Sequence, residues 1–251
     1  FCSKTFDPAT DLPDLSSKVI LITGGNVGIG YGAVKYLAQR SAKVYMAARN
    51  ASKTEAAIEQ LQAEGLGPGN GQVLWIKLDM QDPRNAKNMA EEFMKLENKL
   101  DVLSEYFKNT GNACTGRYRY YIGSIFLLSC SYLLSLLSPF VLTRSLLLVL
   151  ERTASEPDSD VRIVVVSSVS HEVLYGVTPR FRNVDDLNTN APAHGCPLTR
   201  VTVSLSKPTN TLYAKELQRR LTLQGKNITV IALQPGNVDT FFHKPELASW
   251  R

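Results

Sequence analysis

The chain has 251 residues, of which 44% are hydrophobic and 20% charged, with 28 Lys and Arg against 23 Asp and Glu. This composition excludes a disordered, collagen-like or coiled-coil protein, and the length suits one large α/β domain or two small ones. The four cysteines are scattered without a CxxC pair, so we expect neither a metal site nor a disulfide framework. Because Phe1–Asp14 is polar and acidic rather than signal-like, we expect a cytoplasmic protein.

Short apolar runs alternate with stretches of helical spacing along most of the chain. The apolar runs predict buried strands at Val19–Ile22, Lys43–Ala48, Val73–Leu78, Leu100–Leu103, Val161–Val166 and Ile228–Leu233. The helical spacing predicts helices at Tyr31–Gln39, Ser52–Glu64, Asp82–Leu96 and Leu212–Leu221. Ser52 is the expected N-cap of the second helix. Strands that alternate with helices indicate an α/β fold with a doubly wound parallel sheet in a single domain, residues 1–251.

The segment Thr23–Gly30 reads TGGNVGIG and lies between the first strand and the first helix. Glycines there let the backbone turn tightly and approach a pyrophosphate, while the helix N-terminus supplies N–H groups and partial positive charge. A second strand follows about twenty residues on, as a dinucleotide site requires. We therefore expect cofactor contacts from Gly24, Asn26, Gly28, Ile29 and Gly30.

This TGxxxGxG spacing resembles that of the short-chain dehydrogenase/reductase family. The resemblance covers about residues 18–103 and 139–241, and the segment from Ser170 to Leu187 is similar to the retinol-dehydrogenase-like and WW-domain-oxidoreductase-like branch. It implies a Rossmann-like fold. It also implies hydride transfer between a nicotinamide cofactor and a small alcohol or carbonyl compound.

The residues after the second strand predict which nicotinamide cofactor is used. An acid there would hold the ribose 2′-hydroxyl of NAD, whereas an arginine accommodates the 2′-phosphate of NADP. This chain has Arg49 and Asn50, so we expect NADP(H), with NAD(H) the less favoured cofactor. Asp79, which closes the third strand, resembles the acid that the family places beside the adenine. Alternatively, Arg49 is a solvated charge and Asp79 a turn residue.

The resemblance implies that this chain keeps two of the family's catalytic residues, the serine and the lysine. Ser168 follows the strand that begins at Val161 and would hydrogen-bond the substrate carbonyl, and Lys207 matches the lysine of YxxxK and would hold the nicotinamide ribose. The tyrosine position is Val203, and valine cannot transfer a proton. We therefore expect impaired turnover, and the alternative is a non-catalytic NADP(H)-binding protein on the same fold.

Two further observations belong to this part of the site. A segment similar to the family's PGxVxT, which closes over the nicotinamide, supplies Pro235, Gly236, Val238 and Thr240. Tyr213 lies six residues after Lys207, where a helix points its side chain away from the lysine. His171 is expected to be a loop residue.

The resemblance fails in clusters rather than gradually. Where the family continues after the fourth strand with an Asn-Asn-Ala-Gly turn that steadies the sheet, this chain reads Ser104–Lys108, and it departs from the family throughout 104–138. It departs again at 191–206, and it ends at Arg251, before the family's last strand. This clustering favours the hypothesis that 104–138 derives from translated intron or a shifted reading frame.

The anomalous segment also holds most of the surplus charge. Residues 106–150 contain four bases and no acid, which leaves 24 bases against 23 acids elsewhere. A nucleic-acid partner is therefore not expected. The uncharged run Tyr120–Thr143 is long enough to span a bilayer, although a core or subunit-facing helix is the favoured interpretation. A homodimer is the other partnership that the family resemblance suggests.

Overall fold

The computed structural model describes residues 6–66, 71–106, 117–122, 124–129, 136–168 and 198–236. The strands are β1 (Val19–Thr23), β2 (Lys43–Ala48), β3 (Gln72–Lys77), β4 (Val102–Glu105), β5 (Arg117–Ile122), β6 (Ser124–Ser129), β7 (Val161–Val166) and β8 (Ile228–Leu233). The helices are α1 (Pro8–Asp11), α2 (Gly28–Ala38), α3 (Ala51–Glu64), α4 (Pro83–Leu96), α6 (Ser138–Ala154) and α8 (Leu198–Leu223).

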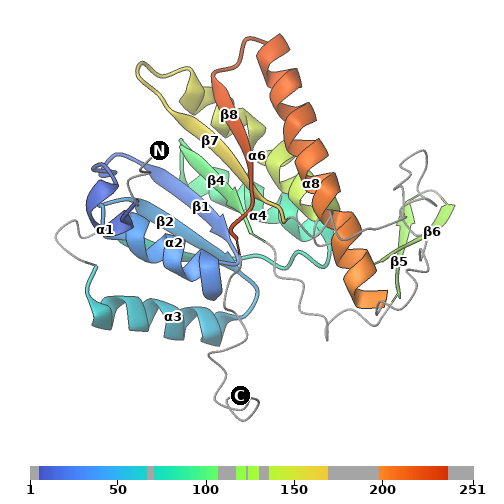
Figure 1. Ribbon diagram of the computed structural model, residues 1–251, viewed down its shortest axis with the longest axis horizontal. Coiled ribbons are helices and arrows are strands. Elements are labelled where there is room, and N and C mark those ends of the chain that lie inside the picture. Colours follow the sequence, from blue (N-terminus) through green and yellow to red (C-terminus); the bar gives the residue numbers. More distant parts are fainter. Residues whose placement is uncertain are drawn as a thin grey trace.

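Six of the strands form one parallel sheet in the order β3-β2-β1-β4-β7-β8 (Figure 1). β1 lies at its centre, where Leu21 is in register with Tyr45 of β2 on one side and with Leu103 of β4 on the other. The strand order reverses between β1 and β4, which is the switch point of a doubly wound sheet. The predicted α/β fold is thus confirmed.

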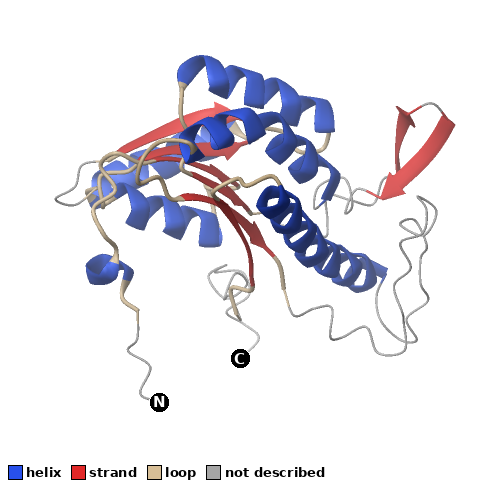
Figure 2. Cartoon of the chain, turned by 90° about the horizontal axis from the view of Figure 1, so that it is seen from above, coloured by secondary structure: helices blue, strands red, loops and turns tan. Residues whose placement is uncertain are grey.

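Helices cover both faces of this sheet (Figure 2). On one face, α2 and α3 bury Val34, Ala38 and Leu61 against the strands. On the other face, α4, α6 and α8 enclose a larger core that contains Phe93 and Leu146. Because both faces are covered, all five residues of β1 are buried, as its continuous apolar run predicts.

Several predicted helix ends were wrong, for reasons of local chemistry. α2 begins at Gly28 rather than Tyr31, so the last glycines of the loop form its first turn. Asn50 caps α3 in place of Ser52, because the Asn50 side chain accepts from Lys53 N at 2.9 Å. α8 is far longer than the predicted Leu212–Leu221 and continues through Pro208.

The predicted apolar run Tyr120–Thr143 does not form one helix. Its beginning lies in β5 and β6, which pair with each other as a separate antiparallel ribbon, and its end lies in α6. Among the described residues, the structure contains no helix that is both long and apolar enough to cross a membrane.

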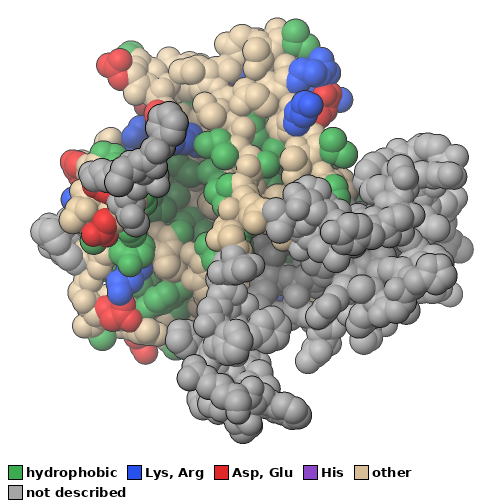
Figure 3. All heavy atoms as spheres, in the orientation of Figure 1, with side chains coloured by type: hydrophobic (Ala, Val, Ile, Leu, Met, Phe, Trp, Pro, Cys, Tyr) green, Lys and Arg blue, Asp and Glu red, His purple; other side chains and the backbone are tan. Residues whose placement is uncertain are grey.

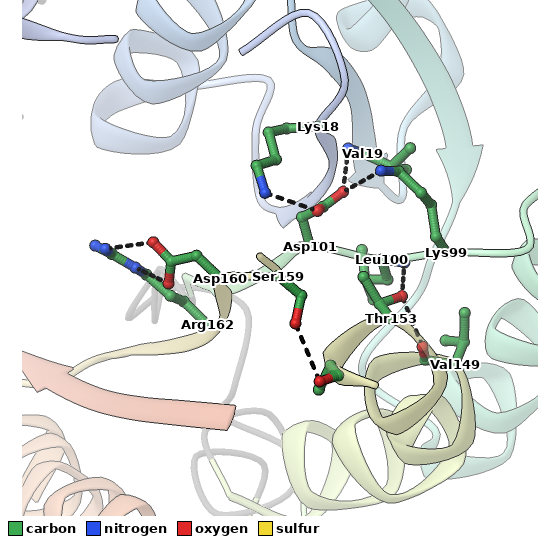
Figure 4. A network of polar contacts seen from close by, with 11 residues as sticks. Lys18, Val19, Lys99, Leu100, Asp101, Val149, Thr153, Ser159, Asp160 and Arg162 are labelled. Carbon is green, nitrogen blue, oxygen red and sulfur yellow. Dashed lines mark hydrogen bonds and ion pairs between the residues drawn. The ribbon is translucent and has the colours of Figure 1, made fainter. Parts of the chain in front are cut away.

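A polar network joins β1, β4, α6 and β7 at the amino-terminal edge of the sheet (Figure 4). The buried Asp101 carboxylate accepts from Val19 N at 2.8 Å and pairs with Lys18 and Lys99. Nearby, the Thr153 hydroxyl accepts from Leu100 N at 2.9 Å. Buried carboxylates are tolerated when their oxygens are satisfied in this way. This edge is therefore closed by internal contacts, whereas the segments that carry most of the predicted site residues lie at the opposite edge.

Candidate functional site

The carboxyl-terminal ends of the parallel strands meet at one edge of the sheet (Figure 1). The segments that follow β1, β2, β3, β7 and β8 carry most of the predicted site residues. In open α/β sheets, ligands bind in the crevice outside this edge, at the switch point between the central strands. The loops after β1 and β4 border that point.

The loop between β1 and α2 has the close packing that its glycines predict. Gly24 and Gly28 both have positive φ values, of 65° and 58°. A Cβ on Gly30 would lie only 2.4 Å from Gly24 O, so this position has no room for a side chain. Asn26 and Ile29 are half-buried in the same loop. The loop thus presents a tightly turned backbone at the beginning of α2.

The N-terminus of α2 has no side-chain cap. Its N-cap residue is Val27, whose side chain carries no hydrogen-bonding group and makes no capping bond. The first N–H groups of a helix have no partner within the helix. Together with the helix dipole, they form a site for a negatively charged oxygen.

The residues after β2 and β3 lie at the same edge of the sheet as this loop. Arg49 is exposed directly after β2, and Asn50 is exposed while its side chain caps α3. Asp79 is half-buried, and its Oδ1 accepts from Gln81 N at 3.0 Å. Asp79 therefore acts as a turn residue, which is the alternative that the sequence left open. Its predicted contact with an adenine is untested by this geometry.

The segment after β4 is tied to β1 although the family's Asn-Asn-Ala-Gly turn is missing. Thr23 Oγ1 accepts from Tyr106 N at 2.9 Å and donates to Tyr106 O at 3.1 Å. A Cβ on Gly24 would lie 3.3 Å from Cδ1 of the Tyr106 ring. The Tyr106 ring therefore packs against the glycine loop. Sequence reasoning missed this link because backbone groups of Tyr106 make it.

Lys207 and the end of β7 form the second half of the site. Ser168 is half-buried just beyond β7, and Pro235 and Gly236 follow β8. Lys207 Nζ donates to Val166 O at 3.1 Å, and burial lowers the pKa of its ammonium group. Ser167, which had no predicted role, donates from Oγ to Lys207 O at 2.8 Å.

A buried acid lies behind the same edge, and sequence reasoning missed it too. Glu105 is fully buried, and the Thr143 hydroxyl donates to its Oε1 at 2.7 Å. Burial raises the pKa of Glu105 to about 8. Tyr213 packs edge-on against Phe140, and burial, then the nearby Glu105, raises its pKa far above the usual range. The prediction that Tyr213 does not replace the catalytic tyrosine stays a prediction.

Some predicted residues lie outside the described parts of the structure. These residues are Val238, Thr240 and His171. Val203 lies in α8, but its side chain is outside the description. The roles predicted for them stay predictions.

Charged groups on the face drawn in Figure 3 stand in small clusters, several of mixed sign. On α8, Arg219 and Arg220 both donate to the Glu216 carboxylate. These hydrogen bonds lower the pKa of Glu216 to about 2. The cations of α8 are thus partly neutralised by their own helix.

Comparison with known sequences finds a matching family model and relatives that are all short-chain dehydrogenases. Residues 18–180 match the family model described as short chain dehydrogenase. A short-chain dehydrogenase/reductase of Armillaria gallica is 37% identical over 90% of this chain and 67% of its own length. A second, from Colletotrichum higginsianum, is 32% identical over 92% of this chain and 57% of its own length. The chain thus spans about three fifths to two thirds of these fungal relatives.

Comparison with solved structures agrees. An uncharacterised protein of Mycobacterium paratuberculosis superposes with a TM-score of 0.64 at 30% identity, over 98% of this chain and 76% of that one. The RhlG/NADP active-site complex of Pseudomonas aeruginosa superposes with a TM-score of 0.61 at 22% identity, over 90% of this chain and 75% of that one. The second likeness shows a shared fold.

Proposed function

Because the chain belongs to the short-chain dehydrogenase/reductase family, we propose that it binds NADP(H) at the carboxyl edge of its sheet. Its reaction would be hydride exchange with a small alcohol or carbonyl compound. The observation that carries this proposal is the loop between β1 and α2, where Gly30 has no room for a Cβ and α2 has no side-chain cap. A pyrophosphate is the dinucleotide group that such a loop accommodates.

Different described residues would bind different parts of the dinucleotide and the substrate. The α2 N-terminus and the backbone from Gly24 to Gly30 would hold the pyrophosphate, and Lys207 would hold the nicotinamide ribose. Ser168 would donate a hydrogen bond to the substrate oxygen, which orients the carbonyl carbon. When bound, the nicotinamide supplies the hydride chemistry, and the protein supplies position. The family's proton donor is missing from this chain, because Val203 occupies its position.

Preference for NADP(H) over NAD(H) rests on Arg49. Arg49 is exposed directly after β2, where a guanidinium can pair with a 2′-phosphate through two parallel hydrogen bonds. A solved structure of similar fold, the RhlG/NADP complex, holds NADP, which is compatible with a nicotinamide cofactor here. Asn50 is committed to capping α3, so Arg49 is the residue on which the preference depends.

The Arg49→Ala variant tests this preference. Loss of a charge-assisted contact of about 1.5–3 kcal/mol should weaken NADPH binding by roughly 10- to 100-fold and leave NADH binding nearly unchanged. Fluorescence titration with each nucleotide measures both affinities. Arg152→Ala, an exposed arginine in the last turn of α6, is the matched control. An equal loss for both nucleotides would contradict the assignment.

Turnover in this chain is proposed to be impaired, because Val203 occupies the tyrosine position of YxxxK. A general acid contributes roughly 10²- to 10⁴-fold to such reactions. Val203→Tyr should therefore raise NADPH oxidation with a panel of carbonyl compounds by about that factor. Rapid turnover by the unaltered chain would refute the impairment.

A non-catalytic NADP(H)-binding protein is the second candidate function, and Val203 is the observation that favours it. Binding needs the glycine loop, Arg49 and Lys207, whereas proton transfer needs the missing phenol. Tight NADPH binding without turnover on any carbonyl compound, together with no gain from Val203→Tyr, would select this second function.

A further inference from the structure

Two hydroxyl groups bind the backbone of Lys207 at the end of β7. Ser167 Oγ donates to Lys207 O at 2.8 Å, and it lies 3.0 Å from Thr211 Oγ1. Thr211 Oγ1 also donates to Lys207 O, at 3.4 Å. We call Ser167, Thr211 and the carbonyl of Lys207 the hydroxyl clasp. The hydroxyl clasp joins the segment directly after β7 to α8 at Lys207, the residue proposed to hold the nicotinamide ribose.

The strand side of the hydroxyl clasp is firmly held. Ser167 is 7% exposed, and its N–H donates to Leu233 O of β8 at 2.8 Å. Val166, the preceding residue, accepts from Lys207 Nζ at 3.1 Å. Val166, the last residue of β7, therefore binds the ammonium group of Lys207, and Ser167, the next residue, binds its backbone carbonyl.

On the helix side, the hydroxyl clasp lies where the hydrogen bonds of α8 are interrupted. Pro208 follows Lys207 inside α8, and proline has no N–H for the helix ladder. Helices commonly bend where the ladder is interrupted. Further along, Ala214 and Leu221 hold α8 in the core independently of the hydroxyl clasp. Loss of the clasp should thus act locally, on Lys207, and leave the packing of the helix largely intact.

We propose that Ser167, assisted by Thr211, is a positioning residue that fixes Lys207 for contact with the ribose of the dinucleotide. The proposal rests on the role of Lys207 in the proposed function. It gives the serine pair at the end of β7 separate tasks, with Ser168 facing the substrate and Ser167 holding the lysine.

A first experiment needs no cofactor. Labelling of the intact chain with acetic anhydride at a series of pH values, read by mass spectrometry, follows the titration of Lys207. Burial lowers the pKa of Lys207, so the wild-type lysine should react at lower pH than exposed lysines. Ser167→Ala should shift the Lys207 titration upward toward that of ordinary lysines, and Ser167→Thr should restore it.

Ser155→Ala is the matched control for this experiment, because Ser155 Oγ donates to a backbone carbonyl at the end of α6, away from Lys207. It should leave the Lys207 titration unchanged. Identical Lys207 titrations in the wild type and Ser167→Ala would overturn the proposal.

A second experiment separates positioning from mere stability. Ser167→Ala should weaken NADPH binding by about three- to tenfold, as loss of one hydrogen bond allows. In a Lys207→Met background the same substitution should have no further effect, because the oriented group is gone. Equal effects in both backgrounds would overturn the proposal. Failure of the wild type to bind NADPH would contradict the proposed function, and the labelling experiment would still decide whether the clasp orients Lys207.

Discussion

Glu105 is a fully buried carboxylic acid at the end of β4. It is 0% exposed, and Oε2 has no hydrogen-bond partner among the described residues. Thr143 from α6 donates to Oε1, and Tyr213 from α8 lies nearby. Arg144 on α6 is exposed, and Lys207 on α8 binds a backbone carbonyl. Burial therefore decides the charge of Glu105, and the folded protein holds it as the neutral acid near neutral pH.

The stability of the protein should depend on this proton. The pKa of Glu105 rises from 4.5 to about 8 on folding, so between these pH values the folded state binds one proton more than the unfolded state. The contribution of Glu105 to stability is then greatest below pH 4.5. It falls by about 1.4 kcal/mol per pH unit as the pH rises through this window, and then levels off.

Glu105→Gln tests this dependence. The amide cannot ionise, so its free energy of unfolding should lack the decline that the wild type shows between about pH 5 and pH 8. Denaturant unfolding at several pH values measures the difference. Glu55→Gln, an exposed residue of α3, serves as the control and should keep the wild-type profile. Parallel profiles for the wild type and Glu105→Gln would show that Glu105 is ionised when folded.

At the scale of elements, one hydroxyl group ties the ends of β1 and β4 together beyond their paired residues. Thr23 ends β1, is 1% exposed, and binds both the N–H and the carbonyl of Tyr106 beyond β4. This link spans the switch point of the sheet and holds the Tyr106 ring against Gly24. It fixes the two strand ends that border the proposed cofactor crevice.

Thr23→Val should break this link while conserving the volume of the side chain. Two backbone groups of Tyr106 lose their partner, which costs about 1–3 kcal/mol of stability. Thr23→Ser keeps the hydroxyl and should retain most of that stability. Thermal and denaturant unfolding of the three proteins measure the effect. A loss of stability in Thr23→Ser together with wild-type stability in Thr23→Val would assign the effect to the methyl group rather than to the hydrogen bonds.

Some elements were predictable and others were not, for physical reasons. β2, β7 and β8 have the bounds that their apolar runs predict, although only β2 is buried along nearly all of its length. The start of α3 was misplaced because Asn50 and Ser52 are both good caps, and only the geometry selects Asn50. Glu105 and Ser167 were missed because nothing in their local sequence signals burial of an acid or contact with a helix forty residues away.

At the scale of the whole molecule, the net charge of +5 is unevenly distributed between residues 106–150 and the rest of the chain. Four of these charges fall within residues 106–150, and the remaining chain is nearly neutral. The start of the anomalous segment 104–138 nevertheless continues β4 and forms the link to Thr23. Its origin in translated intron or a shifted frame stays a hypothesis. Sequencing the transcript tests it, and a message that encodes 104–138 intact would refute it.

The dinucleotide site is the central claim, and calorimetric titration of the intact chain with NADPH and with NADH tests it most directly. The wild type should bind NADPH more tightly than NADH. Gly30→Ala places a Cβ 2.4 Å from Gly24 O and should abolish binding, whereas Gly32→Ala meets no atom within 4 Å and should preserve it. A folded chain that binds neither nucleotide, or a Gly30→Ala variant that binds NADPH as the wild type does, would contradict the claim.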